Sequence, residues 1–109
     1  MEEIIRRSLD EMLDSISEIE QNIQGVAFDD YRNDRKRKIT IANNFETIFE
    51  ALERIPYDFK IKYQQVPWTE LEDLRQKIAG SGYGIDERQL WDAAKNNLMK
   101  AKKALSELA

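Results

Sequence analysis

One feature constrains the fold more than any other: an apolar residue recurs every three or four positions over the first quarter of the sequence. These residues are Ile5, Leu9, Met12, Ile16, Ile19 and Ile23. Steps of four and three place side chains on one face of an α-helix, because a helix turns once every 3.6 residues. We therefore predict a helix over residues 2–24, about 35 Å long at 1.5 Å per residue. Gly25 is expected to end it.

Two further seams have the same spacing. The first consists of Ile41, Phe45, Ile48, Leu52 and Ile55, and the second of Trp91, Ala94, Leu98, Ala101, Leu105 and Leu108. The first predicts a long helix with Asp29 or Asp30 as its N-cap, ended by Pro56. The second predicts one last helix to the C-terminus. Both tryptophans, Trp68 and Trp91, are interpreted as core anchors rather than ligand platforms.

The middle of the chain shows weaker patterns. Residues 57–66 alternate like a strand over too short a stretch for a sheet, so we expect a helical turn and an extended loop. Thr69 with Glu72, and Asp86 with Gln89, have the spacing of capping boxes, in which each side chain bonds an unpaired backbone N–H at the start of a helix. These two pairs predict where the third and the last helix begin.

The composition narrows the fold class. The chain has 4 Gly and 2 Pro, too few turn residues for an architecture of many short strands. Long helices with short connections favour an all-α antiparallel bundle of four to five helices, with residues 1–109 as a single domain. Because the first and last seams run the whole length of their helices, we also expect part of that apolar surface to be buried in a two-fold homodimer.

Two absences exclude whole classes of chemistry. The 109 residues contain no Cys and no His, which removes thiolate nucleophiles, disulfides and the commonest general base and nitrogen ligand for metals. We expect neither a metal nor a cofactor. No apolar run of about 18 residues predicts a membrane span, and no apolar signal region opens the chain, so we expect a cytoplasmic protein.

Three charged or glycine-rich segments are candidate sites. The basic run contains Arg32, Arg35, Lys36, Arg37 and Lys38. Consecutive helical residues point all round the axis, so a solvated face is favoured over a phosphate contact with RNA or a contact with a partner. The segment 80–84 lacks the Lys-Ser/Thr of a phosphate loop and is interpreted as a connector. The acid pairs Asp10–Asp14 and Glu46–Glu50 are interpreted as surface charge rather than metal ligands.

A longer pattern spans residues 28–91. It consists of Phe28-Asp29-Asp30-Tyr31, Asp34-Arg35-Lys36, Ala42-Asn43-Asn44-Phe45-Glu46-Thr47-Ile48-Phe49-Glu50-Ala51, Arg54-Ile55-Pro56, Tyr63, Val66-Pro67-Trp68, Leu74-Arg75-Gln76-Lys77-Ile78, and Gly84-Ile85-Asp86 with Trp91. This pattern resembles the HepT-like branch of the HEPN superfamily. The resemblance implies a homodimeric helical bundle and a ribonuclease toxin paired with a minimal nucleotidyltransferase antitoxin.

The resemblance also assigns site residues. The family motif is an Arg, four residues, a His, one residue and a Tyr, and it falls here on Arg75, Gly80 and Gly82. The antitoxin modifies the motif Tyr by adenylylation, and Tyr83 is the phenol next to that position. Arg75 and Tyr83 are therefore the candidates for catalysis. The candidate RNA-binding residues are Arg32, Arg35, Lys36 and Lys77.

Three hypotheses about function follow. The favoured one is a HepT-like pseudoenzyme that acts through its dimer and partner surfaces, because general acid–base catalysis has lost its His. The second is a metal-independent ribonuclease that still works through Arg75 and Tyr83, with help from Ser81 and the basic residues. The third is a helical adaptor unrelated to toxin–antitoxin function.

Overall fold

Helices are the only regular elements in residues 2–80 and 87–108, the part of the chain that the computed structural model describes. They are α1 (Glu3–Ile23), α2 (Phe28–Arg32), α3 (Arg35–Arg54), α4 (Tyr57–Lys62), α5 (Trp68–Gly80), α6 (Glu87–Lys95) and α7 (Asn97–Leu108). The predicted all-α class is confirmed. Among the described residues, none of these helices combines the length and apolar character that crossing a bilayer requires.

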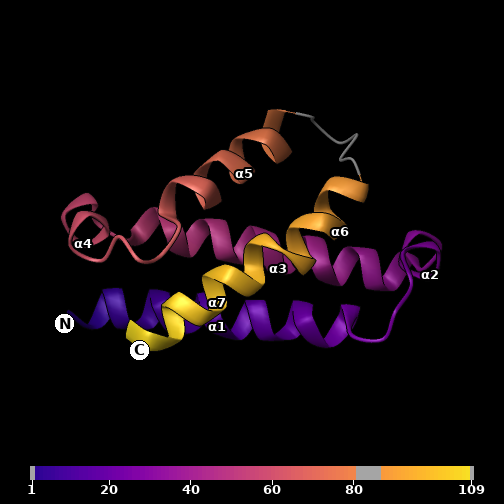
Figure 1. Ribbon diagram of the computed structural model, residues 1–109, viewed down its shortest axis with the longest axis horizontal. Coiled ribbons are helices and arrows are strands. Elements are labelled where there is room, and N and C mark those ends of the chain that lie inside the picture. The colour runs from indigo at the N-terminus through magenta and orange to yellow at the C-terminus, as the bar shows by residue number, and fades with distance from the viewer. Residues whose placement is uncertain (1, 81–86, 109) are drawn as a thin grey trace.

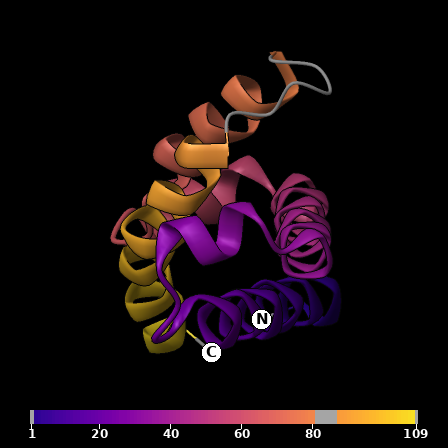
Figure 2. The same ribbon diagram turned by 90° about the vertical axis from the view of Figure 1, so that its right-hand side faces the viewer.

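An antiparallel pair of long helices, α1 and α3, forms the base of the bundle (Figure 1). The successive helices α6 and α7 pack against α1 and close the other side of the core (Figure 2). α5 packs on α3 and projects beyond this layer, and α4 reverses the chain between them (Figures 1 and 2).

The core is formed by the residues of the predicted seams. All six seam residues of α1 are buried, as are Ile41, Phe45, Ile48, Leu52 and Ile55. Trp91, Ala94, Leu98, Ala101 and Leu105 are buried on α6 and α7, and only Leu108 is half-buried. Trp68 and Trp91 are buried as well, which confirms their interpretation as core anchors.

The burial of the seams removes one argument for a homodimer, the one that was based on the length of the apolar seams. Because α3 covers one flank of α1 and α7 covers another, a single chain buries the whole seam of α1. The seams therefore supply no surplus apolar stripe for a second subunit. Four large hydrophobic side chains are exposed within the described residues: Ile4, Ile39, Tyr57 and Ile61.

The connection between α1 and α3 corrects a predicted cap. Gly25 has φ +72°, in the left-handed region that glycine adopts without strain, and α1 ends as expected. The next residues form α2 instead of a loop, with Asp29 and Asp30 inside its first turn. The N-cap of α3 is Asp34, whose carboxylate accepts a hydrogen bond from the Arg37 N–H at 3.1 Å. The choice of Asp29 or Asp30 was wrong because the extra turn of helix moves the start of α3.

We expect replacement of Asp34 by Ala to lower the melting temperature at neutral pH. The Arg37 N–H hydrogen bond, with the Arg37 side chain adding to it, holds the pKa of Asp34 below its ordinary value. A carboxyl with a lowered folded-state pKa stabilises the fold above its unfolded pKa, and this contribution is lost as the pH falls through the folded value. The difference from the natural chain should therefore shrink below about pH 4. Thermal melts from pH 7 to pH 3 check this, with Asp30→Ala as control; a difference independent of pH contradicts it.

One further helix start and one helix length differ from prediction. Residues 57–62 form α4, so the expected helical turn is present. α5 begins at Trp68, which puts Thr69 inside the helix, and Glu72 pairs with Lys60 instead of closing a capping box. The predicted last helix is two helices separated at Asn96, next to Asn97, whose side-chain amide donates to Glu70 on α5. Asp86, the predicted cap of that helix, lies outside the described residues.

Candidate functional site

Arg75 lies midway along α5, on the flank that faces the end of α3. Leu71 and Leu74 are buried toward the body of the bundle, which sets the rotation of α5. The Arg75 side chain is 42% exposed, and its Nη2 lies 3.2 Å from Oε2 of Glu53 on α3. The motif arginine is therefore held by a carboxylate from another helix.

A groove of about 440 Å³ opens beside this ion pair. Its lining residues are Leu52, Glu53, Lys60, Glu72, Arg75 and Gln76. Lys60 comes from α4, and its Nζ donates a hydrogen bond to Oε1 of Glu72 at 2.7 Å. Two cations and two carboxylates thus line one groove, supplied by α3, α4 and α5. We call it the Arg75 groove.

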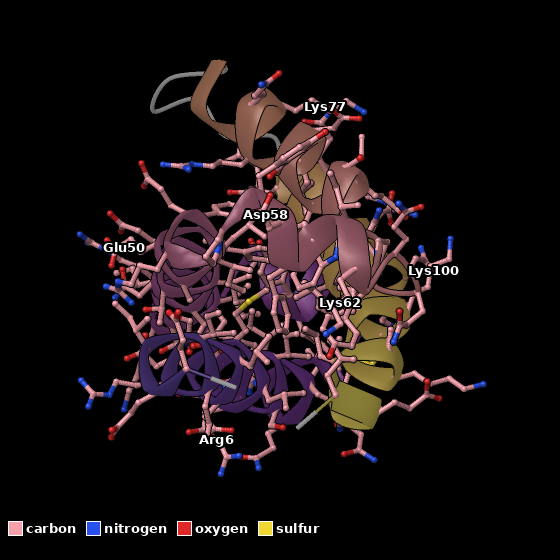
Figure 3. The ribbon with its side chains drawn as sticks, turned by 90° about the vertical axis from the view of Figure 1, so that its left-hand side faces the viewer. Arg6, Glu50, Asp58, Lys62, Lys77 and Lys100 are labelled. Carbon is pink, nitrogen blue, oxygen red and sulfur yellow. The ribbon has the colours of Figure 1, made fainter. Side chains whose placement is uncertain are left out.

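Lys77 lies on a different face of α5. Two residues along a helix rotate a side chain by about 200°, so Arg75 and Lys77 point apart. Lys77 lines a second groove, of about 330 Å³, whose other polar residues are Glu70, Asp73, Gln89, Asp92 and Asn97. Figure 3 shows Lys77 at the outer end of α5, on the opposite side of the molecule from Arg6. The structure therefore separates Lys77 from Arg75.

The basic run at the start of α3 divides into two sets. Arg32, Arg35 and Lys36 are exposed, whereas Arg37 and Lys38 make contacts within the chain. Arg37 Nη1 donates to the Asn22 carbonyl at 2.6 Å, satisfying an acceptor near the C-terminus of α1. Lys38 Nζ donates to Glu87 on α6 at 2.9 Å. Three cations of the run therefore face solvent, and two make contacts within the chain.

The basic run and the Arg75 groove lie at opposite ends of α3. Arg35 is the first residue of α3 and Glu53 lies in its last turn. Eighteen residues of helix correspond to about 27 Å. The exposed cations Arg32, Arg35 and Lys36 are therefore too distant to contact the same phosphate as Arg75. The predicted RNA-binding residues do not form one patch.

The remaining motif positions are only partly described. Gly80 is the last residue of α5. Ser81, Gly82 and Tyr83 lie outside the described residues. The described residues contain no group of three or more acidic side chains arranged to hold a metal ion.

Phe28, Tyr31 and Trp91 form an aromatic cluster near the basic run, and this packing was not predicted from the sequence. Trp91 stacks on Tyr31 with ring centroids 4.9 Å apart, and Phe28 meets Trp91 edge-on at 6.0 Å. Burial, with the Glu87 carboxylate adding to it, raises the pKa of Tyr31 to about 12. This phenol therefore stays protonated at neutral pH and is a core residue rather than a proton carrier.

Comparisons with known proteins converge on one family. A family model described as ribonuclease HepT-like matches residues 12–108. A Thermococcus cleftensis protein provisionally named ribonuclease HepT is 30% identical over 100 residues, covering 92% of this chain and 91% of the relative. A protein of Methanocaldococcus jannaschii provisionally named an RNase is 30% identical over 104 residues, covering 95% and 86%. Another so named, from Caldanaerobacter subterraneus subsp. tengcongensis, is 24% identical over 103 residues, covering 94% and 92%. No solved structure matches the chain.

Proposed function

Because this chain belongs to the ribonuclease HepT-like family, we propose that it is a toxin–antitoxin protein of this type that contacts RNA but cleaves it slowly or not at all. One observation carries the proposal: the chain has no His, and Gly80 stands where the family motif has one. Arg75 is kept, and it lies in a groove open to solvent. On this proposal, Arg75 supplies a phosphate contact while the proton carrier of the family motif is missing.

The chemistry of RNA cleavage supports this separation of binding from catalysis. Attack by the 2′-hydroxyl needs a base to accept its proton and an acid to protonate the leaving oxygen. Arg75 stays protonated at any working pH, so it stabilises charge on a phosphate without moving a proton. An unperturbed phenol has a pKa near 10 and is a poor base at pH 7, so a tyrosine by itself does not replace the missing His.

We expect the natural chain to bind single-stranded RNA and to cleave it slowly or not at all. Replacing Arg75 by Ala should weaken binding about tenfold, because a hydrogen bond to a charged group contributes about 1.5 kcal/mol. Arg6→Ala is the matched control, since Arg6 is exposed on the side of the bundle away from α5 (Figure 3). Fluorescence anisotropy with a labelled RNA measures binding, and gel electrophoresis of the same RNA measures cleavage. RNA cleavage that Arg75→Ala abolishes would instead support an active ribonuclease.

The proposal includes two protein partners, a second copy of the chain and a minimal nucleotidyltransferase antitoxin. For the homodimer, sedimentation at micromolar concentration should give roughly twice the 12.8 kDa chain mass. The reason is that a standard interface of about 1,600 Å² normally holds at this concentration. The exposed apolar side chains on α4, Tyr57 and Ile61, are available for such contacts. A monomer at ten times this concentration would refute the dimer.

A further inference from the structure

We propose that the Arg75 groove binds one phosphate of an RNA backbone through Arg75 and Lys60, and that Glu53 and Glu72 compete with this phosphate for the two cations. This inference rests on the proposed RNA contact. It adds a second cation to the contact and assigns two carboxylates that weaken it. None of the family-motif positions includes Glu53, Lys60 or Glu72.

The geometry of the groove brings the two cations to one place. Arg75 on α5 and Lys60 on α4 both line it, although they lie 15 residues apart in sequence. The Lys60 side chain is only 15% exposed, so its ammonium group is held near the groove instead of moving freely in solvent. The groove, at about 440 Å³, is within the usual range for ligand sites.

The two ion pairs are of a kind that a phosphate can replace. The Glu53 and Glu72 side chains are 67% and 47% exposed, and ion pairs near solvent contribute little to stability. Glu53 meets Arg75 through one carboxylate oxygen, whereas a phosphate can accept two parallel hydrogen bonds from a guanidinium. Exchange of carboxylate for phosphate therefore gains a contact at Arg75, and the displaced Glu53 and Glu72 carboxylates can both return to solvent.

The balance of charge in the groove indicates that a phosphate must compete with Glu53 and Glu72 and is not simply attracted by free cations. Glu53 and Glu72 balance Arg75 and Lys60, so the groove has no net positive charge before RNA arrives. Each carboxylate must give up its cation when the phosphate binds. Removing a carboxylate while keeping its shape should therefore tighten RNA binding, in contrast to removing a cation.

The decisive measurement is the affinity of the full chain for a fluorescein-labelled 2′-O-methyl oligouridylate of about 12 nucleotides. This probe has RNA geometry but no free 2′-hydroxyl, so binding is read without cleavage. Glu53→Gln should tighten binding two- to fivefold, the factor that corresponds to a surface ion pair of at most about 1 kcal/mol. Glu46→Gln, which removes an exposed charge two turns earlier on α3, should change the affinity less than twofold.

A double variant distinguishes two explanations for tighter binding: loss of the carboxylate that competes for Arg75, and a general loss of negative charge. The double variant Glu53→Gln/Arg75→Ala should bind no more tightly than Arg75→Ala, because Glu53 acts through Arg75. Lys60→Gln should weaken binding and lower the slope of log affinity against log salt by about 0.7. Circular dichroism establishes that each variant is folded. Glu72→Gln, at a half-exposed position, tests the same competition at Lys60 should Lys60→Gln unfold.

Each failure has a distinct meaning. If Arg75→Ala binds the probe as well as the natural chain does, the proposed RNA contact fails and this inference fails with it. If Arg75→Ala weakens binding but Glu53→Gln behaves like Glu46→Gln, the competition alone is overturned. If micromolar adenosine monophosphate displaces the probe while equal inorganic phosphate does not, the groove is a nucleotide site and the assignment to an RNA backbone is wrong.

Discussion

The double replacement Gly80→His and Gly82→Tyr should raise RNA cleavage at least about 100-fold over the natural chain. Both changes restore residues of the family motif around Arg75. The reason for the size of the effect is that a positioned general acid or base typically contributes 10²–10⁴-fold. Initial rates with a fluorogenic RNA substrate, measured without added metal, provide the test.

Two control variants make this repair experiment specific. Adding Arg75→Ala to the repaired chain should remove most of the gain, because the phosphate charge then loses its stabilising cation. Gly82→Tyr alone should leave the rate near the natural value, since a phenol with an ordinary pKa is a weak base. If the natural chain already cleaves RNA as fast as the repaired one, and Arg75→Ala abolishes both activities, the pseudoenzyme hypothesis is wrong.

Trp91→Ala should lower the free energy of unfolding by about 3–5 kcal/mol, the usual cost of replacing a buried large aromatic residue by Ala. Trp91 is 5% exposed, stacks on Tyr31 and contacts Phe28, so it joins α6 to α2. A typical domain is stable by about 5–15 kcal/mol, so the variant should lose a large part of its stability.

Urea denaturation followed by circular dichroism measures this loss. Ile39→Ala is the control, because Ile39 is an apolar residue of α3 that is 50% exposed. It should change the free energy of unfolding by no more than about 0.5 kcal/mol. A cost below about 1 kcal/mol for Trp91→Ala would show that the aromatic cluster relaxes around the missing ring and does not join α6 to α2 as described.

Helix faces were predictable from the sequence, and helix boundaries were not. The face of a helix depends on spacing along one segment, so the seam from Ile5 to Ile23 identified buried residues without knowledge of their neighbours. The start of a helix depends on which of several similar side chains lies close enough to accept a hydrogen bond from a free backbone N–H. Asp29, Asp30 and Asp34 are all plausible caps by residue type, and only the turn of helix at α2 selects Asp34.

The homodimer shows a second limit of reasoning from one segment at a time. A full-length seam indicates that an apolar face must be covered, and it does not indicate whether the cover comes from the same chain. In this fold α3 and α7 bury the seam of α1, so the homodimer remains a prediction that the resemblance supports and the seams do not.

The helical class, the seam residues and the presence of Arg75 on the third expected helix were predictable from the sequence, because each depends on local spacing or on a contiguous motif. The charges that share a groove with Arg75 became evident from the packing of the helices alone. Glu53 and Lys60 come from helices distant in sequence, while Lys77, two residues away, faces elsewhere. The physical reason is that helix rotation and packing set these neighbours, and both depend on the whole core rather than on the residues around Arg75.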